Sequence, residues 1–590
     1  MKRRMPETTL KQRSIEKNMA ETAVMKRMAI LMEMRKQILG LVPEKICEAI
    51  LEYSHPAALV HSFPQEDFYF IICDIGLEDS LELLSLASDR QLEYILDMEI
   101  WEKDRIDMIS TTRWLASMLK ADPDRMVRWY AQKNNGLIRY YLFKNIEVVI
   151  REHDQDPSEL GEEFFTLDDV FYFRFIDEPE GRQTDIAIKN GFISEFLERL
   201  AEFDHVEYQE ILLKSKIIIP AEYEEEAFRL KNVRTSEKGF APFHEAIEIY
   251  QPLVPDDFKK QPKKILKHSD SLNPLPLYPI SMLDGKNNFT EALQLIGNNE
   301  SLSEVLTEFA GMCNKVIAAD QIKIKNREQL RMVVKKVCGY MNLGLSRLIR
   351  PGEKTPADEN ARFIQRYCLS DIFRLGYGQC LELKWQAEKW KKNAWFEANR
   401  LPLNFWGEDW LGVLGGLLIK KPLFYDNYRT GVLYREFDST EDIEKTKNVF
   451  ENIIVFDKLL SKMDIDSKSM DKGLLWTYKN LVLTLWARSR MDLARQPAAV
   501  ALDEFMPFYN DLWECPVDND GETELRKIKT SAKIDFINWI SECLHVEPDM
   551  IGTQIGKCLG SLIDEIESEY GQVATGDIDP RFIHLFMLKT

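Results

Sequence analysis

Helix-start signals recur at short intervals near the beginning of this chain, and they restrict its fold more than any other sequence feature. They are prolines suited to a first helical position and one capping box: Pro43, Pro56, Pro64 and Ser88–Gln91. Apolar clusters lie between them. Because a short helix cannot bury such a cluster alone, the pattern predicts a superhelix of short stacked helices over residues 38–135.

The next segment, residues 136–251, is acidic and aromatic. Residues 151–230 hold eight Lys/Arg and 22 Asp/Glu, a net charge of −14 (8 − 22). The sequences VFYFRF (170–175) and TDIAIKNG (184–191) are separated by EPEG, and this arrangement predicts a small β-hairpin. Helical periodicity returns at Ile193–Phe203, so we expect a mixed, mainly helical region.

A proline-rich boundary follows at residues 252–285, with six prolines and five lysines between positions 259 and 267. Such sequence is typical of an extended, semi-rigid linker. Residues 286–590 contain long amphipathic stretches and helix-start signals, which predict a large C-terminal helical bundle or array. The fold class expected for the whole chain is therefore mostly α, with strand confined to hairpins near 170–190 and 423–437.

The charge of the chain argues against nucleic acid as a partner of its acidic body. The 590 residues include 77 Lys/Arg and 97 Asp/Glu, a formal net charge of −20, which repels phosphate backbones. Residues 1–37 differ, with ten Lys/Arg and four Asp/Glu (net +6). We interpret them as a partly disordered, solvated arm. The alternative is a basic arm that touches an anionic surface.

The cysteines and the apolar runs indicate a cytoplasmic location. The nine cysteines are scattered, without the close pairs of a zinc site or a disulfide framework. The longest apolar run, Trp410–Ile419, has ten residues, whereas a helix needs about 20 to cross a bilayer. No secretory signal pattern is found at the N-terminus, so we expect a cytoplasmic protein without a transmembrane segment.

Several longer stretches resemble an uncharacterised family of large bacterial cytoplasmic proteins. They are LASDRQLEYILDMEIWEKDRID, AEYEEEAFRLKNVRTSEKGFAPFHEAIEIYQPL, YCLSDIFRLGYGQCLELKWQAEKW and LPLNFWGEDWLGVLGGLLIKKPLFYDN. The family has no assigned activity, so the resemblance implies no catalytic residue. Residues 42–107 also resemble, more weakly, the helical superhelix of magnesium-transporter N-terminal domains and flagellar motor-switch proteins, which implies a fold only.

No catalytic, cofactor-binding or metal motif is recognised. Gly376-Tyr377-Gly378 lacks the third glycine of a dinucleotide fingerprint, and no phosphate-binding loop or nucleophile elbow is present. The eight histidines are dispersed. We therefore expect no metal and no cofactor. An enzymatic role stays open but is not favoured.

The densest chemical feature is a group of five tryptophans within 26 residues, from Trp385 to Trp410. The last two of these tryptophans lie beside two acids and three glycines. Together these residues form our candidate interaction surface: Trp406, Glu408, Asp409, Trp410, Gly412, Gly415 and Gly416. Glu408 and Asp409 are expected in the first turn of a helix. The glycines then allow close approach by either another part of the chain or a partner.

Two functions follow as hypotheses. The first is a cytoplasmic helical scaffold or protein-interaction protein, with another protein as its partner. The second is an enzyme without a recognisable motif, whose site lies in a cleft of the C-terminal domain near Trp406–Gly416. A scaffold is expected to present a groove or an apolar patch, and an enzyme a deep pocket with convergent polar groups.

Overall fold

A computed structural model describes residues 26–176, 182–264, 278–281, 283, 285–297, 299–349, 356–463, 465, 470, 473–514 and 526–589. Most of the basic arm, residues 1–25, lies outside this part of the chain. The molecule divides into two compact units, and the division falls within helices α18 (Arg327–Leu348) and α20 (Leu369–Asn393). The division into five segments that the sequence suggested stays a prediction.

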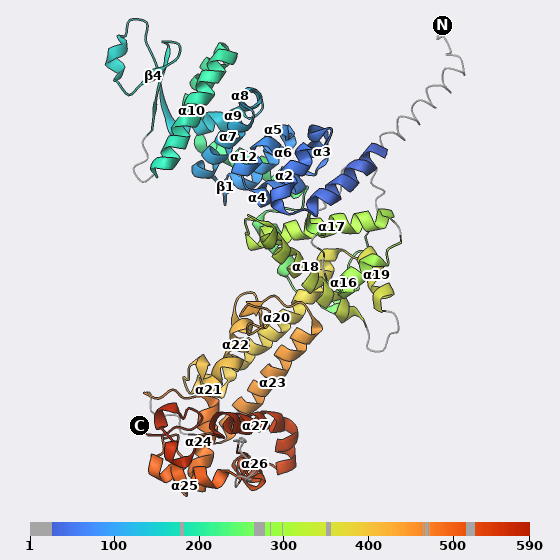
Figure 1. The fold of residues 1–590 in the computed structure, drawn as a ribbon, viewed down its shortest axis with the longest axis vertical. Helices are drawn as coiled ribbons and strands as arrows, with labels where there is room; N and C mark the ends of the chain where they lie inside the picture. The colour runs from blue at the N-terminus through green and yellow to red at the C-terminus, as the bar shows by residue number, and fades with distance from the viewer. Residues whose placement is uncertain are drawn as a thin grey trace, which may run out of the picture. The chain divides into compact units, whose positions relative to one another are not determined.

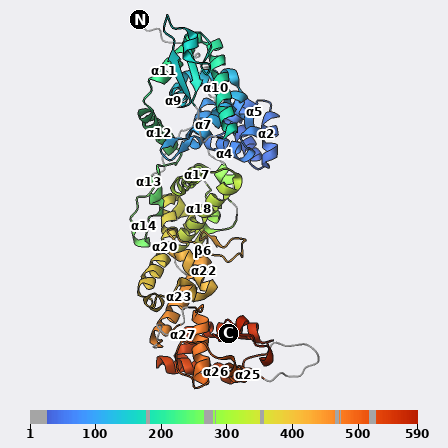
Figure 2. The same ribbon diagram turned by 90° about the vertical axis from the view of Figure 1, so that its left-hand side faces the viewer.

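The first unit begins with a helix over residues 26–39, followed by the predicted stack of short helices (Figure 2). Each of α2 to α7 packs on the next helix or the next but one, which buries the apolar clusters that no single helix covers. The helices are α2 (Pro43–Leu51), α3 (Pro56–Ser62), α4 (Gln65–Ile75), η1 (Glu78–Ser80), α5 (Leu81–Leu86), α6 (Asp89–Glu99), α7 (Met108–Ala121), α8 (Pro123–Gln132) and α9 (Asn135–Asn145). A short hairpin, β1 (Trp101–Glu102) with β2 (Arg105–Ile106), separates α6 from α7.

The local start signals are largely confirmed. Pro43 and Pro56 begin their helices, and Ser88 and Gln91 form the complete capping box. Pro64 lies one position earlier than predicted, as the N-cap of α4.

The acidic middle region contains a three-stranded antiparallel sheet instead of the predicted hairpin. Its strand order is β3 (Ile146–Ile150), β5 (Phe171–Phe175) and β4 (Phe165–Thr166). The expected strand VFYFRF is β5, but TDIAIKNG was assigned wrongly and belongs to α10 (Gln183–Phe203). The reason is that Lys189, Phe192, Phe196 and Leu200 are buried at helical spacing, so the helical period begins upstream of Ile193.

The rest of the first unit is helical. Its elements are η2 (Pro157–Leu160), α11 (His205–Lys216), α12 (Pro220–Ser236), α13 (Phe243–Ala246), η3 (Ile247–Tyr250), α14 (Pro255–Phe258), α15 (Tyr278–Ser281), α16 (Asn288–Gln294), α17 (Asn299–Asp320) and α19 (Pro356–Arg366). Within the predicted linker, Phe258 is buried against Phe363 and Tyr367. Residues 265–277 lie outside the described residues, so the linker stays a prediction.

The second unit consists of long helices followed by a compact group at the C-terminus (Figure 1). After α20 come α21 (Trp395–Ala398), η4 (Leu403–Trp406), α22 (Gly407–Leu418), the hairpin β6 (Phe424–Tyr425) with β7 (Tyr434–Arg435), α23 (Thr440–Lys462), α24 (Tyr478–Arg490), α25 (Leu502–Leu512), α26 (Thr530–Leu544), α27 (Pro548–Tyr570), η6 (Thr575–Asp577) and η7 (Pro580–Phe582). The mostly α fold is confirmed, and the predicted hairpin near 423–437 is present. In the described part of the chain, no helix combines the length and apolar character of a membrane span.

Candidate functional site

Trp406, the centre of the predicted interaction surface, is fully buried in an aromatic cluster. Its ring centroid lies 5.3 Å from Phe405, 5.8 Å from Trp390 and 6.0 Å from Trp410. Trp410 stacks on Tyr478 at 4.3 Å with nearly parallel rings. Such pairs add stability beyond their buried area, so this cluster is a structural core. Trp385, at 48% exposure, is the one member of the tryptophan group that is largely exposed.

The chain's own β6–β7 hairpin approaches the three candidate glycines of α22, Gly412, Gly415 and Gly416. A Cβ atom added to Gly412 would lie 2.3 Å from the ring of Tyr425, and one added to Gly416 would lie 2.4 Å from the carbonyl oxygen of Leu423. At Gly415 the nearest atom is the hydroxyl of Tyr434, at 2.8 Å. The glycines therefore serve close packing inside the unit, which is one of the two outcomes that the sequence left open.

A half-buried arginine holds this hairpin in place. The guanidinium of Arg435 donates two hydrogen bonds of 2.7 Å to Asp442 and one of 3.0 Å to Asp426. Asp426 also accepts from the backbone N–H and the hydroxyl of Thr430. Burial alone would raise the pKa of Asp442, but hydrogen bonds from Arg435 and from the Asp438 backbone outweigh it and lower that pKa below its ordinary value.

Glu408 and Asp409 are the exposed members of the predicted surface. They lie in the first turn of α22 as predicted, after Gly407, whose φ of +72° breaks the preceding chain. Acidic side chains there are favoured by the helix dipole. The structure thus explains five of the seven candidate residues by packing and leaves these two facing solvent.

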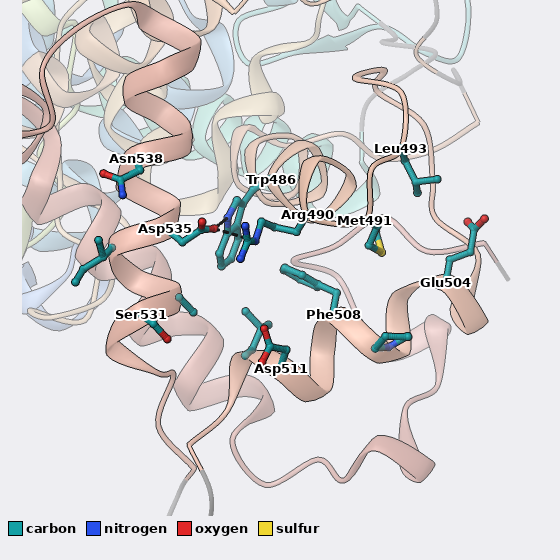
Figure 3. A pocket seen from close by; sticks show the side chains of 14 residues that line it. Trp486, Arg490, Met491, Leu493, Glu504, Phe508, Asp511, Ser531, Asp535 and Asn538 are labelled. Atoms are coloured by element: carbon teal, nitrogen blue, oxygen red, sulfur yellow. Dashed lines mark hydrogen bonds and ion pairs between the residues drawn. The ribbon is translucent and has the colours of Figure 1, made fainter.

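A cavity of about 760 Å³ lies among α24, α25 and α26 (Figure 3), and we call it the C-terminal groove. It is lined by aromatic, aliphatic and acidic side chains from all three helices and from the turn after α24: Trp486, Arg490, Met491, Leu493, Glu504, Pro507, Phe508, Asp511, Leu512, Ser531, Ala532, Ile534, Asp535 and Asn538. No residue of the Trp406–Gly416 segment is among them.

Local sequence shapes two walls of the groove. Helix α24 ends at Arg490. Two residues later Asp492 is left-handed with φ +51°, and the N–H of Leu493 donates to the carbonyl of Arg488. This turn brings Leu493 to the cavity. In α25, Glu504, Pro507, Phe508 and Asp511 recur at helical spacing and form one face. Pro507 lies inside this helix and has no N–H to donate.

The groove has an aromatic wall and an acidic rim. Trp486 and Phe508 meet edge to face at 5.2 Å, and the indole N–H of Trp486 donates to Asp535 at 3.1 Å. Arg490 pairs with the same carboxylate oxygen at 3.1 Å (Figure 3). With Glu504 and Asp511, the lining carries one cation and three carboxylates. A cationic group with an apolar stem suits such a site, because it gains both aromatic packing and charge neutralisation.

The lining of the groove contains no histidine or cysteine, and no group of three or more His, Cys, Asp or Glu residues in the described part of the chain is arranged to hold a metal ion. Sequence analysis missed the groove because its residues are spread over positions 486–538. The signal that could have revealed it is the mixture of aromatic and acidic residues on one face of α25.

The chain is a mostly helical protein whose second unit contains a cavity with an aromatic wall and an acidic rim. The chain belongs to DUF6178, a family of unknown function whose model matches residues 23–589. This match confirms the resemblance to an uncharacterised family. No curated protein and no solved structure matches the chain.

Proposed function

We propose that this chain is a cytoplasmic protein-interaction protein whose C-terminal groove binds a segment of a partner protein. The segment is one that presents a lysine or arginine beside an apolar side chain. The observation that carries the proposal is the acidic rim beside the wall formed by Trp486 and Phe508.

The apolar half of the site supplies contact area. Met491, Leu493 and Ile534 border the cavity, and Ile534 is 54% exposed. Exposed apolar side chains around aromatic residues are typical of protein contact sites, where a few well-packed anchors dominate affinity. A cavity of about 760 Å³ has room for one or two large side chains.

The charged half selects the partner. Asp535 is paired with Arg490, and Asp511 is paired with Lys529 at 2.8 Å. Among the described residues, Glu504 forms no ion pair and is exposed. An incoming cation therefore finds one free carboxylate and two that can share their charge, whereas an incoming anion is repelled.

The test is selection of binding peptides from a displayed library of random 12-residue peptides on the full chain. Enriched peptides are expected to combine Lys or Arg with aromatic or branched residues. Their affinity, measured by fluorescence anisotropy, should fall about tenfold in Glu504→Lys, because a contact of about 1.4 kcal/mol becomes repulsive.

The neighbouring residue provides a matched control. Asp503 is in the same first turn of α25 and is exposed, but it does not line the groove. Asp503→Lys makes the same charge change and should leave peptide binding unchanged. Equal weakening by both variants, or enrichment of acidic peptides, would contradict the proposal.

A further inference from the structure

A second cavity, of about 700 Å³, lies in the first unit, where α7 packs on both α5 and α10. We call it the α7 cavity. Figure 2 labels these three helices within the same unit. Its charge is opposite to that of the C-terminal groove: it is lined by the cations Arg113, Lys120, Arg182 and Lys189 and by the carboxylates Glu78 and Asp185.

We propose that the α7 cavity binds a small organic anion, a carboxylate or a phosphate or sulfonate ester, that carries an apolar body. This inference is independent of the function proposed for the C-terminal groove, since it concerns different residues and the opposite charge.

Three cations of this cavity are open to a ligand. Arg113, Lys120 and Arg182 are exposed and form no ion pair with another described residue. Exposed cations gathered around one cavity attract an external anion.

The arrangement on α7 fits one elongated ligand. Arg113 and Lys120 are seven residues apart, about 10 Å along the helix axis. Ile109, Ala116 and Ser117 lie on the same face, while Trp114, Leu115 and Met118 bury the opposite face in the core. This face therefore alternates positive charge with apolar surface.

The opposite wall is the start of α10. Its N-cap residue is Arg182, which makes no side-chain cap to the first-turn N–H groups. Ile186 and Ile188 border the cavity beside it, and Ile188 is 46% exposed, as Ile109 is 60% exposed on the facing helix. An anion placed here gains the helix dipole and the Arg182 charge, and its apolar body covers the isoleucines.

Lys189 forms part of the wall. It is 4% exposed, and its ammonium donates to the carbonyl of Ile176 at 3.0 Å. The three exposed cations of the lining, Arg113, Lys120 and Arg182, outnumber its two carboxylates, Glu78 and Asp185, by one (3 − 2). That excess favours a ligand with a negative charge.

The experiment titrates the full chain with 8-anilinonaphthalene-1-sulfonate, an aromatic anion whose fluorescence rises on binding. Wild type should show a saturable component. The double variant Arg113→Gln/Lys120→Gln should weaken it about tenfold, as expected for the loss of two exposed charge contacts. The charge-matched control Lys45→Gln/Arg90→Gln, two exposed cations outside the cavity, should bind like wild type.

Displacement separates charge from apolar contact. Octanoate should displace the probe, octylammonium with the same tail should not, and inorganic phosphate should do so only at much higher concentration. The thermal midpoint of the double variant should equal or exceed that of wild type, because unpaired like charges are removed. Displacement by octylammonium equal to that by octanoate, or wild-type probe binding by the double variant, would overturn the proposal.

Discussion

Two tryptophans of the second unit, Trp406 and Trp486, are almost equally buried, at 0% and 1% exposure, yet their surroundings differ. Trp406 is enclosed by aromatic rings near a helix that the β6–β7 hairpin covers. Trp486 has a core on one side, where its ring lies 4.7 Å from Phe536, and a cavity on the other. The comparison shows that a local concentration of tryptophan indicates a core. Whether a buried tryptophan also borders an open site depends on how the neighbouring helices pack around it.

The largest effect is expected from Arg435→Ala, which removes the cation that holds the β6–β7 hairpin in place. Asp442 and Asp426 would then be left buried without their cation, which costs about 3–5 kcal/mol of unfolding free energy. Urea unfolding followed by tryptophan fluorescence measures this loss. Arg435→Lys keeps the charge without the two-pronged contact and should fall between wild type and Ala. A loss below about 1 kcal/mol in Arg435→Ala would mean that the hairpin is not essential.

Acid should weaken the same region. The pKa of Asp442 and the pKa of Asp426 both lie below the ordinary value, because hydrogen bonds to the charged form outweigh the opposing effect of burial. A carboxyl whose folded pKa is depressed stabilises the fold above its unfolded pKa of about 4, and this stability is lost as pH falls further. Unfolding free energy measured from pH 6 downward should therefore drop below about pH 4. The drop should be smaller in Arg435→Ala.

Gly412→Ala tests the contact between α22 and the hairpin. The added methyl group would lie 2.3 Å from the Tyr425 ring, so the hairpin must shift, and we expect a loss of about 1–3 kcal/mol. Gly431→Ala does not serve as a control, since Gly431 has φ +90° and the substitution strains the backbone. Gly560, on α27, has nothing near its Cβ position, and Gly560→Ala should cost nothing. Equal effects of Gly412→Ala and Gly560→Ala would refute the close contact.

A substitution at the C-terminal groove should change the unfolding free energy in the opposite direction. Pro507→Ala restores a backbone donor inside α25 at an exposed position, and we expect a gain of about 1 kcal/mol. The same change removes apolar surface from the groove rim and should weaken the selected peptides. Unfolding free energy and peptide anisotropy, measured on one preparation, check both effects. A stabilised variant with unchanged peptide binding would show that Pro507 is not part of the binding surface.

Sequence reasoning succeeded where a few neighbouring residues determine the structure. The Ser88 capping box, and the start of α22 at Gly407 with Glu408 in its first turn, are local features and were predicted correctly. It failed at residues 184–191, where Ile186 and Ile188 suggest strand alternation but the burial of Lys189 and Phe192 follows the helix.

The open sites were beyond sequence reasoning for a different reason. The C-terminal groove exists because three consecutive helices pack so that a space remains beside Trp486, and the α7 cavity requires α10 to pack on α7. No spacing within one segment encodes such a gap. The pairing of Gly412 with Tyr425 was likewise invisible, although the need for some close neighbour was inferred from the glycines.

The smallest effect is expected at Glu408 and Asp409, the two members of the predicted surface that remain exposed. Each lies in the first turn of α22, so Glu408→Ala and Asp409→Ala should each reduce unfolding free energy by about 0.3–1 kcal/mol through the helix dipole. Because neither lines the C-terminal groove, binding of the selected peptides should not change. Glu408→Gln removes the charge while keeping the side-chain volume and should reproduce most of the loss, which identifies the dipole as the cause. If either alanine variant weakened peptide binding at unchanged stability, the partner surface would have to extend from the groove to the start of α22. The contrast between the packed segment Trp406–Gly416 and the open C-terminal groove would then no longer hold.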